Sequence, residues 1–160
     1  MLRLSKWTVP LGALLIAACG SDSGTGPQTE FDGVKYTAAV VLVPTGGQTL
    51  LSVVVTLTNT GGETRSRTYP ASCPVRIRLY RSADNALLYD ETRRACSAEP
   101  TATVSLASLE SKTLQSGVRF PGTIAGDSLP FTTYVVRAVV LTEGTKEVLI
   151  NAGTYALVSS

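Results

Sequence analysis

Apolar side chains recur at every second position in much of this chain, and this period limits the fold more than any other feature. In Leu51–Thr58, leucine and valine at odd positions alternate with serine, valine and threonine, and in Val75–Tyr80 apolar residues alternate with Arg76, Arg78 and Tyr80. Side chains of a strand point alternately to its two faces, whereas an amphipathic helix repeats every 3.6 residues. The runs are also rich in β-branched residues, which favour strands. Both patterns predict strands with one buried face.

Further runs of the same kind predict strands near 34–43, 63–69, 86–89, 101–106, 112–120, 133–142 and 148–158. Glycine, proline, asparagine and aspartate separate many of them, as in the hairpin turn expected at Ala83–Asn85. A single helical turn is expected at Ala107–Lys112. About eight strands at this spacing predict one immunoglobulin-like antiparallel β-sandwich.

The strand at 133–142 has a feature typical of such sandwiches. Tyr134 stands near its start and resembles a tyrosine corner, in which the hydroxyl bonds the backbone a few residues upstream. The residues expected on its buried face are Tyr134, Val136, Ala138 and Val140, with Arg137 on the other face.

The first nineteen residues have the pattern of an export signal. Arg3 and Lys6 precede the apolar run Trp7–Ile16, which is too short to span a bilayer, and small residues precede Cys19. This resembles a bacterial lipoprotein signal, whose cysteine carries the lipid; an ordinary secretory signal containing a cysteine is the alternative. We therefore expect a signal peptide at 1–18, a lipid on Cys19, a flexible tether at 19–30 and a domain at 31–160.

This assignment places the protein in the bacterial envelope. It would be anchored to the membrane through Cys19, on the outer membrane or facing the periplasm. The residues after Cys19 are Gly20 and Ser21, without the aspartate that would retain a lipoprotein at the inner membrane, which favours the outer membrane.

Processing also removes the net charge. The 160-residue chain has 14 lysines and arginines and 12 acidic residues, and the signal holds two of the basic ones, so 12 of each sign remain. A neutral domain gives no argument for nucleic acid as a partner. Histidine is absent, which excludes histidine-dependent nucleophile activation and the commonest metal ligand. We expect no enzymatic activity, no cofactor and no metal.

The two remaining cysteines, Cys73 and Cys96, are an even pair in an exported chain, which predicts a disulfide. Closing this loop would stabilise the fold by about 3 kcal/mol. A two-thiol metal site is the alternative, but it lacks the third and fourth ligands that zinc needs.

The order of these segments is similar to that of the BsuPI-type intracellular proteinase inhibitors, a family of immunoglobulin-like sandwiches. The matching parts are the strand and asparagine turn at 53–61, the turn and strand at 72–79, and the segments at 86–90, 111–114 and 134–138. The resemblance covers about 34–158. It implies the sandwich fold and a protein partner, with a protease as one candidate.

The chain departs from that family at two places. Pro130–Thr133 replaces a Pro-Gly turn before Tyr134, and Thr92–Cys96 replaces an aromatic-rich stretch. An exported lipoprotein also cannot share the target of a cytoplasmic inhibitor. The resemblance therefore supports the fold more than it supports protease inhibition.

Three groups of residues are candidate sites. The first is a partner-binding loop with Arg93 and Arg94, beside Cys96. A loop held by the disulfide could present an arginine to a protease, or it could be an ordinary charged loop.

The second is an anion-binding patch, which would form if the strands of Arg65, Arg67, Arg76 and Arg78 pair. If they do not pair, these arginines would be the solvent-exposed face of a sheet. A glycosidase-like pair would have to come from Asp84, Asp90, Glu91 and Glu99, for which a small sandwich offers little room.

These observations favour a binding module that meets a protein partner, with a protease as one option. The alternative is a structural or adhesive envelope lipoprotein that recognises glycans or serves as an accessory subunit. The sequence does not determine the oligomeric state.

Overall fold

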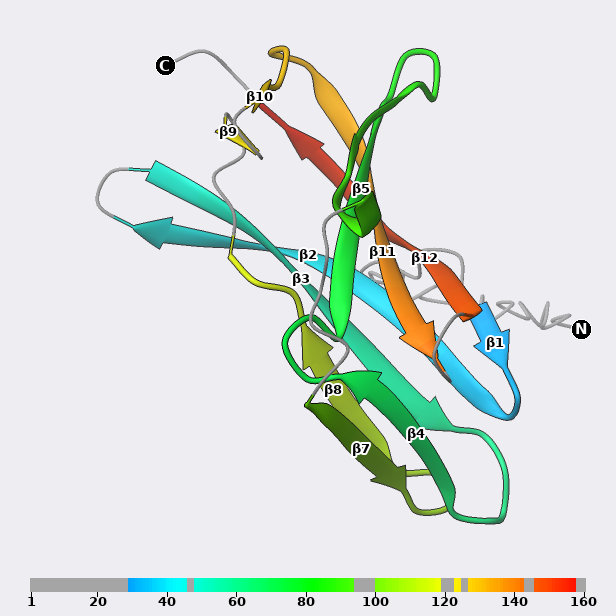
Figure 1. Cartoon of the computed structure of the whole chain (residues 1–160). Helices are drawn as coiled ribbons and strands as arrows, with labels where there is room; N and C mark the ends of the chain where they lie inside the picture. The colour runs from blue at the N-terminus through cyan, green and yellow to red at the C-terminus, as the bar shows by residue number, and fades with distance from the viewer. Residues whose placement is uncertain are drawn as a thin grey trace, which may run out of the picture.

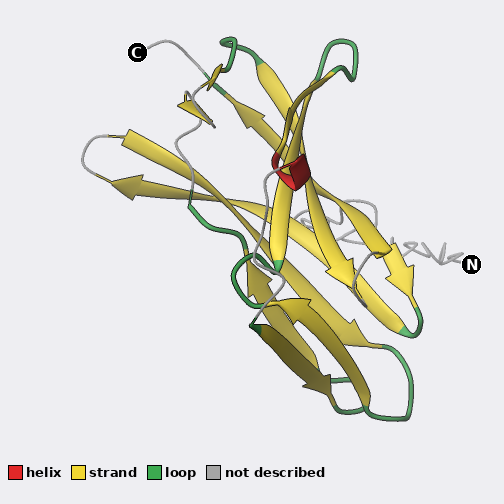
Figure 2. Cartoon of the chain, in the orientation of Figure 1, coloured by secondary structure: helices red, strands yellow, loops and turns green. Residues whose placement is uncertain are grey.

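The computed structural model describes residues 29–45, 48–93, 100–118, 123–124, 127–142 and 146–157. Within these residues the regular secondary structure is nearly all strand, and the sole helix is a short 3-10 turn, η1 (Glu91–Arg93) (Figure 2). The predicted all-β class is confirmed. The strands are β1 (Thr29–Phe31), β2 (Val34–Thr45), β3 (Gln48–Asn59), β4 (Arg65–Pro70), β5 (Val75–Arg81), β6 (Leu87–Asp90), β7 (Thr101–Leu106), β8 (Ser111–Gln115), β9 (Thr123–Ile124), β10 (Asp127–Ser128), β11 (Thr133–Thr142) and β12 (Lys146–Ala156).

Two four-stranded antiparallel sheets make the body of the sandwich (Figure 1). One has the order β1-β2-β3-β8 and the other β12-β11-β5-β6. Strands β4 and β7 form a separate antiparallel pair below them in the view of Figure 1, and β9 and β10 form a second, very short pair. The hairpin of β2 and β3 is the longest element and extends past the other strands at one side (Figure 1).

The core lies between the two large sheets, because the alternating apolar residues of both point inward. On the first sheet Leu51, Val53, Val55 and Leu57 are fully buried, as the period of two predicted. The second sheet contributes Ile77 and Leu79 of β5, with Tyr134, Val136, Ala138 and Val140 of β11, all at most 1% exposed. Tyr69 and Leu106 of the β4–β7 pair belong to the same apolar cluster.

The predicted tyrosine corner is present. The Tyr134 side chain is fully buried and its hydroxyl donates to the carbonyl of Pro130, four residues upstream. Burial raises the pKa of this hydroxyl, so it stays protonated and keeps its donor role. The bond fixes the chain where it enters β11.

A buried asparagine ties three segments together at the other end of the sandwich. Asn59 is fully buried, and the two hydrogens of its amide nitrogen are shared among the carbonyls of Glu63, Leu106 and Ala107, at 2.7, 3.1 and 2.9 Å from the nitrogen. Its amide oxygen accepts from the Gly61 amide at 2.9 Å. One side chain thus ends β3, shapes the turn after it and holds the end of β7.

Two predicted boundaries are wrong for local reasons. The helical turn at Ala107–Lys112 is instead a tight turn closed by the Glu110 amide on the Ala107 carbonyl at 3.1 Å, with Leu109 at φ +61°. A left-handed residue cannot continue a helix, and β8 begins at Ser111. The strand predicted to reach residue 120 ends at Gln115, since the Ser116 hydroxyl takes the place of a backbone group and accepts from the Val53 amide at 2.9 Å.

The predicted tether is too long at its C-terminal end. Thr29 and Glu30 pair with Tyr36 and Lys35 in the β1–β2 hairpin. Asp32 and Gly33 make its two-residue turn with φ of +47° and +69°, a conformation that Asp-Gly favours. Residues 19–28 of the predicted tether, and the signal peptide at 1–18, lie outside the described residues.

Candidate binding site at the end of strand β6

The structure places one of the two candidate loop arginines. Arg93 is the last residue of η1, directly after the edge strand β6, and 81% of its side chain is exposed. Arg94 and Cys96 lie outside the described residues, as does the predicted lipid-bearing Cys19. Cys73 lies in the turn between β4 and β5, where its amide donates to the Pro70 carbonyl at 3.3 Å. The predicted Cys73–Cys96 disulfide therefore stays a prediction.

Asp90 fixes the turn from which Arg93 projects. Its Oδ1 accepts from the Thr92 amide at 3.0 Å and from the Thr92 hydroxyl at 2.6 Å, which bends the chain at the end of β6. Its Oδ2 lies 3.9 Å from Nε of Arg93. Only 11% of the Asp90 side chain is exposed, so these contacts form away from bulk water.

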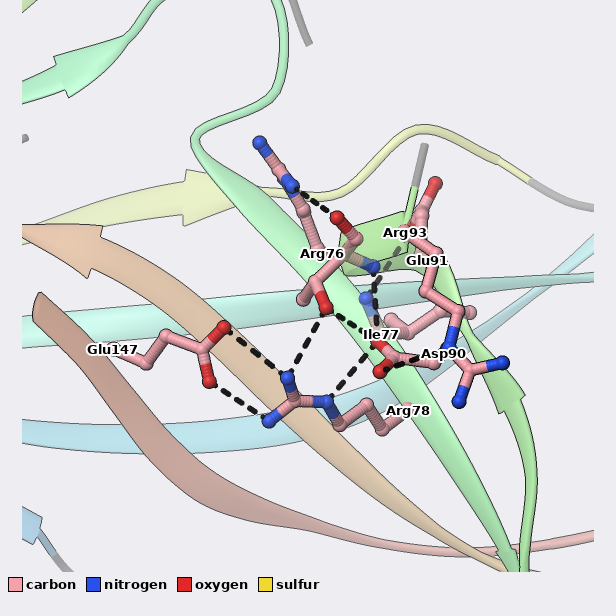
Figure 3. Close-up of polar contacts among 8 residues, drawn as sticks. Arg76, Ile77, Arg78, Asp90, Glu91, Arg93 and Glu147 are labelled. Carbon is pink, nitrogen blue, oxygen red and sulfur yellow. Dashed lines mark hydrogen bonds and ion pairs between the residues drawn. The ribbon is translucent and has the colours of Figure 1, made fainter. Parts of the chain in front are cut away.

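Arg78 of β5 joins this turn to the far edge of the sheet (Figure 3). Its Nε donates to Asp90 at 3.1 Å, and its two terminal nitrogens donate to the two oxygens of Glu147 in β12 at 2.9 and 3.1 Å. One of these nitrogens also donates to the Thr92 hydroxyl at 3.1 Å. Such a bidentate contact sets the guanidinium plane as well as its position.

The pKa values of this cluster follow from these contacts. Burial alone would raise the pKa of Asp90, but the Thr92 hydrogen bonds and the Arg78 guanidinium outweigh it and lower the pKa. Burial alone would lower the pKa of Arg78, but hydrogen bonds to Glu147 and Asp90 raise it. Asp90 and Arg78 are therefore both charged at neutral pH.

Two more contacts fasten the same turn to β5. Nη1 of Arg76 donates to the Thr92 carbonyl at 3.0 Å, and Oε2 of Glu91 accepts from the Ile77 amide at 3.0 Å. Glu91 is only 5% exposed. Where β6 ends, its carboxylate accepts the hydrogen bond from the β5 amide that a strand carbonyl would otherwise accept. The η1 turn is thus held by side chains from both strands, and Arg93 projects from a fixed base (Figure 3).

The four-arginine anion-binding patch, which required the two strands to pair, does not form. Arg65 and Arg67 lie on β4, which pairs with β7, whereas Arg76 and Arg78 lie on β5 in another sheet. Arg67 is 5% exposed and its Nη2 contacts Asp32 at 2.6 Å, with Arg65 at 3.7 Å from the same carboxylate. Arg78 is neutralised by two carboxylates. These side chains stabilise turns and do not form one open cationic surface.

The acidic residues do not form a catalytic pair among the described residues. Asp84 lies in the predicted hairpin turn and contacts Arg81 at 3.0 Å and the Ala86 amide at 3.2 Å, while Asp90 and Glu91 hold η1. Glu99 lies outside the described residues. No group of three metal-ligating side chains occurs in the described part of the chain.

Sequence reasoning missed the roles of Asp90, Thr92 and Glu147. One local signal exists: an aspartate two residues before threonine often forms such a side-chain turn. The contribution of Glu147 had no local signal, because it lies 69 residues from Arg78.

Comparison with known proteins adds little to this geometry. No family model matches the chain, and no curated protein is similar to it in sequence. A solved structure, described as the X-ray structure of Northeast Structural Genomics Consortium target SoR45, aligns over 79% of this chain and 87% of its own length. Its identity to this chain is 8% and the TM-score is 0.38.

Within the described residues, no helix has the length and apolar character needed to cross a bilayer.

Proposed function

We propose that this chain is a lipid-anchored envelope protein that binds a protein partner through the segment containing Arg93 and Arg94, with a trypsin-like protease as the first partner to test. The observation that carries the proposal is the exposed Arg93 side chain on a turn that is otherwise locked to β5. The resemblance to BsuPI-type inhibitors and the export signal supply the class of protein and its compartment.

The fixed base matters because ordering a loop on binding costs free energy. Each immobilised long side chain costs roughly 0.5–1.5 kcal/mol, and a pre-ordered segment avoids part of this. Arginine is also among the residues that dominate binding energy at interfaces, and the specificity pocket of trypsin-like proteases is acidic. An arginine on a rigid turn therefore suits such a pocket.

Inhibition assays with the purified full chain test the proposal. We expect inhibition of at least one trypsin-like protease, and a loss of affinity of about 30-fold in R93A or R94A, as for an interface residue worth about 2 kcal/mol. The matched control is R81A, an exposed arginine paired with Asp84 in the β5–β6 turn region, which should leave inhibition unchanged. Full activity of trypsin-, chymotrypsin- and subtilisin-like proteases in the presence of the chain would refute a protease as partner.

The anchor and the disulfide are tested separately by mass spectrometry of the native protein. We expect a lipid-modified amino terminus at Cys19 and no reactive thiol at Cys73 or Cys96. An unmodified terminus would refute the envelope anchor, and two alkylatable thiols would refute the pairing.

A further inference from the structure

A hollow on the outer face of the second sheet is not used by the turn at Arg93. It has a volume of about 230 Å³ and is lined by Thr29, Arg137, Leu149 and Asn151. Arg137 of β11 lies directly opposite Asn151 of β12 in the ladder. The start of β1 borders the hollow, since the Thr29 hydroxyl donates to the Leu149 carbonyl at 3.1 Å.

Arg137 is a half-buried cation that is positioned without being neutralised. Its guanidinium lies 4.3 Å from the centre of the Tyr80 ring, and Nη2 is 3.4 Å from Oδ1 of Asn85. Neither partner carries a charge. The ion pairs among the described residues engage Lys112 and five arginines, but not Arg137; the five are Arg65, Arg67, Arg78, Arg81 and Arg93.

Asn151 presents a second donor. Its Oδ1 accepts from the Gly153 amide at 2.9 Å, at a bulge where Gly153 has φ +108°. This bond orients the side-chain amide, and no acceptor for its nitrogen is found among the described residues. Two oriented donors therefore line the hollow.

The ion-paired carboxylates of this sheet and of its β5–β6 turn contact other arginines; in the turn, Asp84 contacts Arg81. Asp90 and Glu147 lie on the same sheet, but both contact Arg78. The lining residues themselves include no carboxylate. The lining residues thus include an arginine without an ion-pair partner, an asparagine with a side-chain amide donor, a threonine oxygen and the apolar side chain of Leu149, a set that suits a small anion with hydroxyl groups.

We propose that this hollow binds a carboxylate-bearing sugar, a uronic acid. Its volume of about 230 Å³ lies below the roughly 300 Å³ at which drug-sized pockets begin, so a single small unit fits. A free amino acid carries an ammonium group for which the lining offers no anionic partner. A sugar acid places its carboxylate on Arg137 and its hydroxyls on Asn151 and Thr29.

Titration of sodium glucuronate into the isotope-labelled full chain in mild detergent tests this by NMR. We expect saturable shifts at Arg137 and Asn151, none with neutral glucose and weaker binding of sodium glutamate. R137Q and N151D should each weaken glucuronate binding at least tenfold. N151D is the sharper variant, because aspartate keeps the Oδ1 acceptor for Gly153 while adding a repelling charge.

R81Q and R93A are the matched controls and should bind glucuronate normally, which separates this site from the proposed partner-binding turn. Thermal unfolding of each variant shows whether it is folded. Absence of saturable binding, equal binding of glucose or of glutamate, or unchanged binding by folded R137Q and N151D would overturn the proposal.

Discussion

The cluster around Arg78 predicts how firmly the Arg93 turn is held. We consider the substitution R78M, which keeps most of the apolar part of the side chain and removes the charged guanidinium group. Asp90 would keep both Thr92 hydrogen bonds but would remain a nearly buried carboxylate, 11% exposed, with only the exposed Arg93, 3.9 Å away, as a countercharge. Breaking a fully buried pair costs 3–5 kcal/mol; the partial exposure here reduces this to about 2–3 kcal/mol.

Two further variants divide this cost between the partners. Glu147 is 38% exposed, so E147Q should cost only about 0.5 kcal/mol. The control R81M removes an exposed pair, with side chains 41% and 53% exposed, and should cost about 0–0.5 kcal/mol. The expected order of destabilisation is therefore R78M, then E147Q, then R81M.

Urea unfolding of the full chain measures these free energies of unfolding, and native-state hydrogen exchange at the Thr92 amide shows whether the turn opens locally. R78M should lower the unfolding midpoint and accelerate exchange at Thr92, whereas R81M should do neither. If R78M destabilises the chain no more than R81M does, the cluster does not hold the turn and the argument for a pre-ordered Arg93 fails.

Three further predictions follow from single residues. Y134F removes the hydroxyl bond to the Pro130 carbonyl and should cost about 1–2 kcal/mol in urea unfolding; an unchanged midpoint would show that the corner is not stabilising. The lowered folded-state pKa of Asp90 means that its contribution is complete above the unfolded value of about 3.9 and is lost as pH falls through the folded value. Wild type should therefore lose more stability below pH 4 than D90N, and parallel pH profiles would contradict this. L109N should stabilise the chain by about 0.5–1 kcal/mol, because asparagine tolerates the left-handed φ of +61° better than leucine, and a lower melting temperature would refute it.

The strands were predictable because their signal is local. Alternation in Leu51–Thr58 and Val75–Tyr80 places the buried residues of β3 and β5 correctly, since a strand needs nothing beyond its own sequence to separate two faces. Tyr134 was predictable for the same reason, because its acceptor lies only four residues away. The predicted helical turn at Ala107–Lys112 is wrong because Leu109 has a left-handed φ of +61°, which helix propensity does not predict.

The candidate site was only partly predictable. The sequence named Arg93 as a loop arginine, but four arginines in alternating positions looked equivalent. Strand pairing gives them different partners. Arg67 donates to Asp32, 35 residues away in the sequence, and Arg78 donates to Glu147, 69 residues away. Arg137 was recognised only as an outward-facing residue of β11.

The amino-acid sequence thus determined where the strands lie and which of their faces are buried, because both depend on neighbours a few residues apart. The tertiary structure alone decided which cations are neutralised and which remain available, because opposite charges must come within about 4 Å to pair and the partners come from strands far apart in the chain.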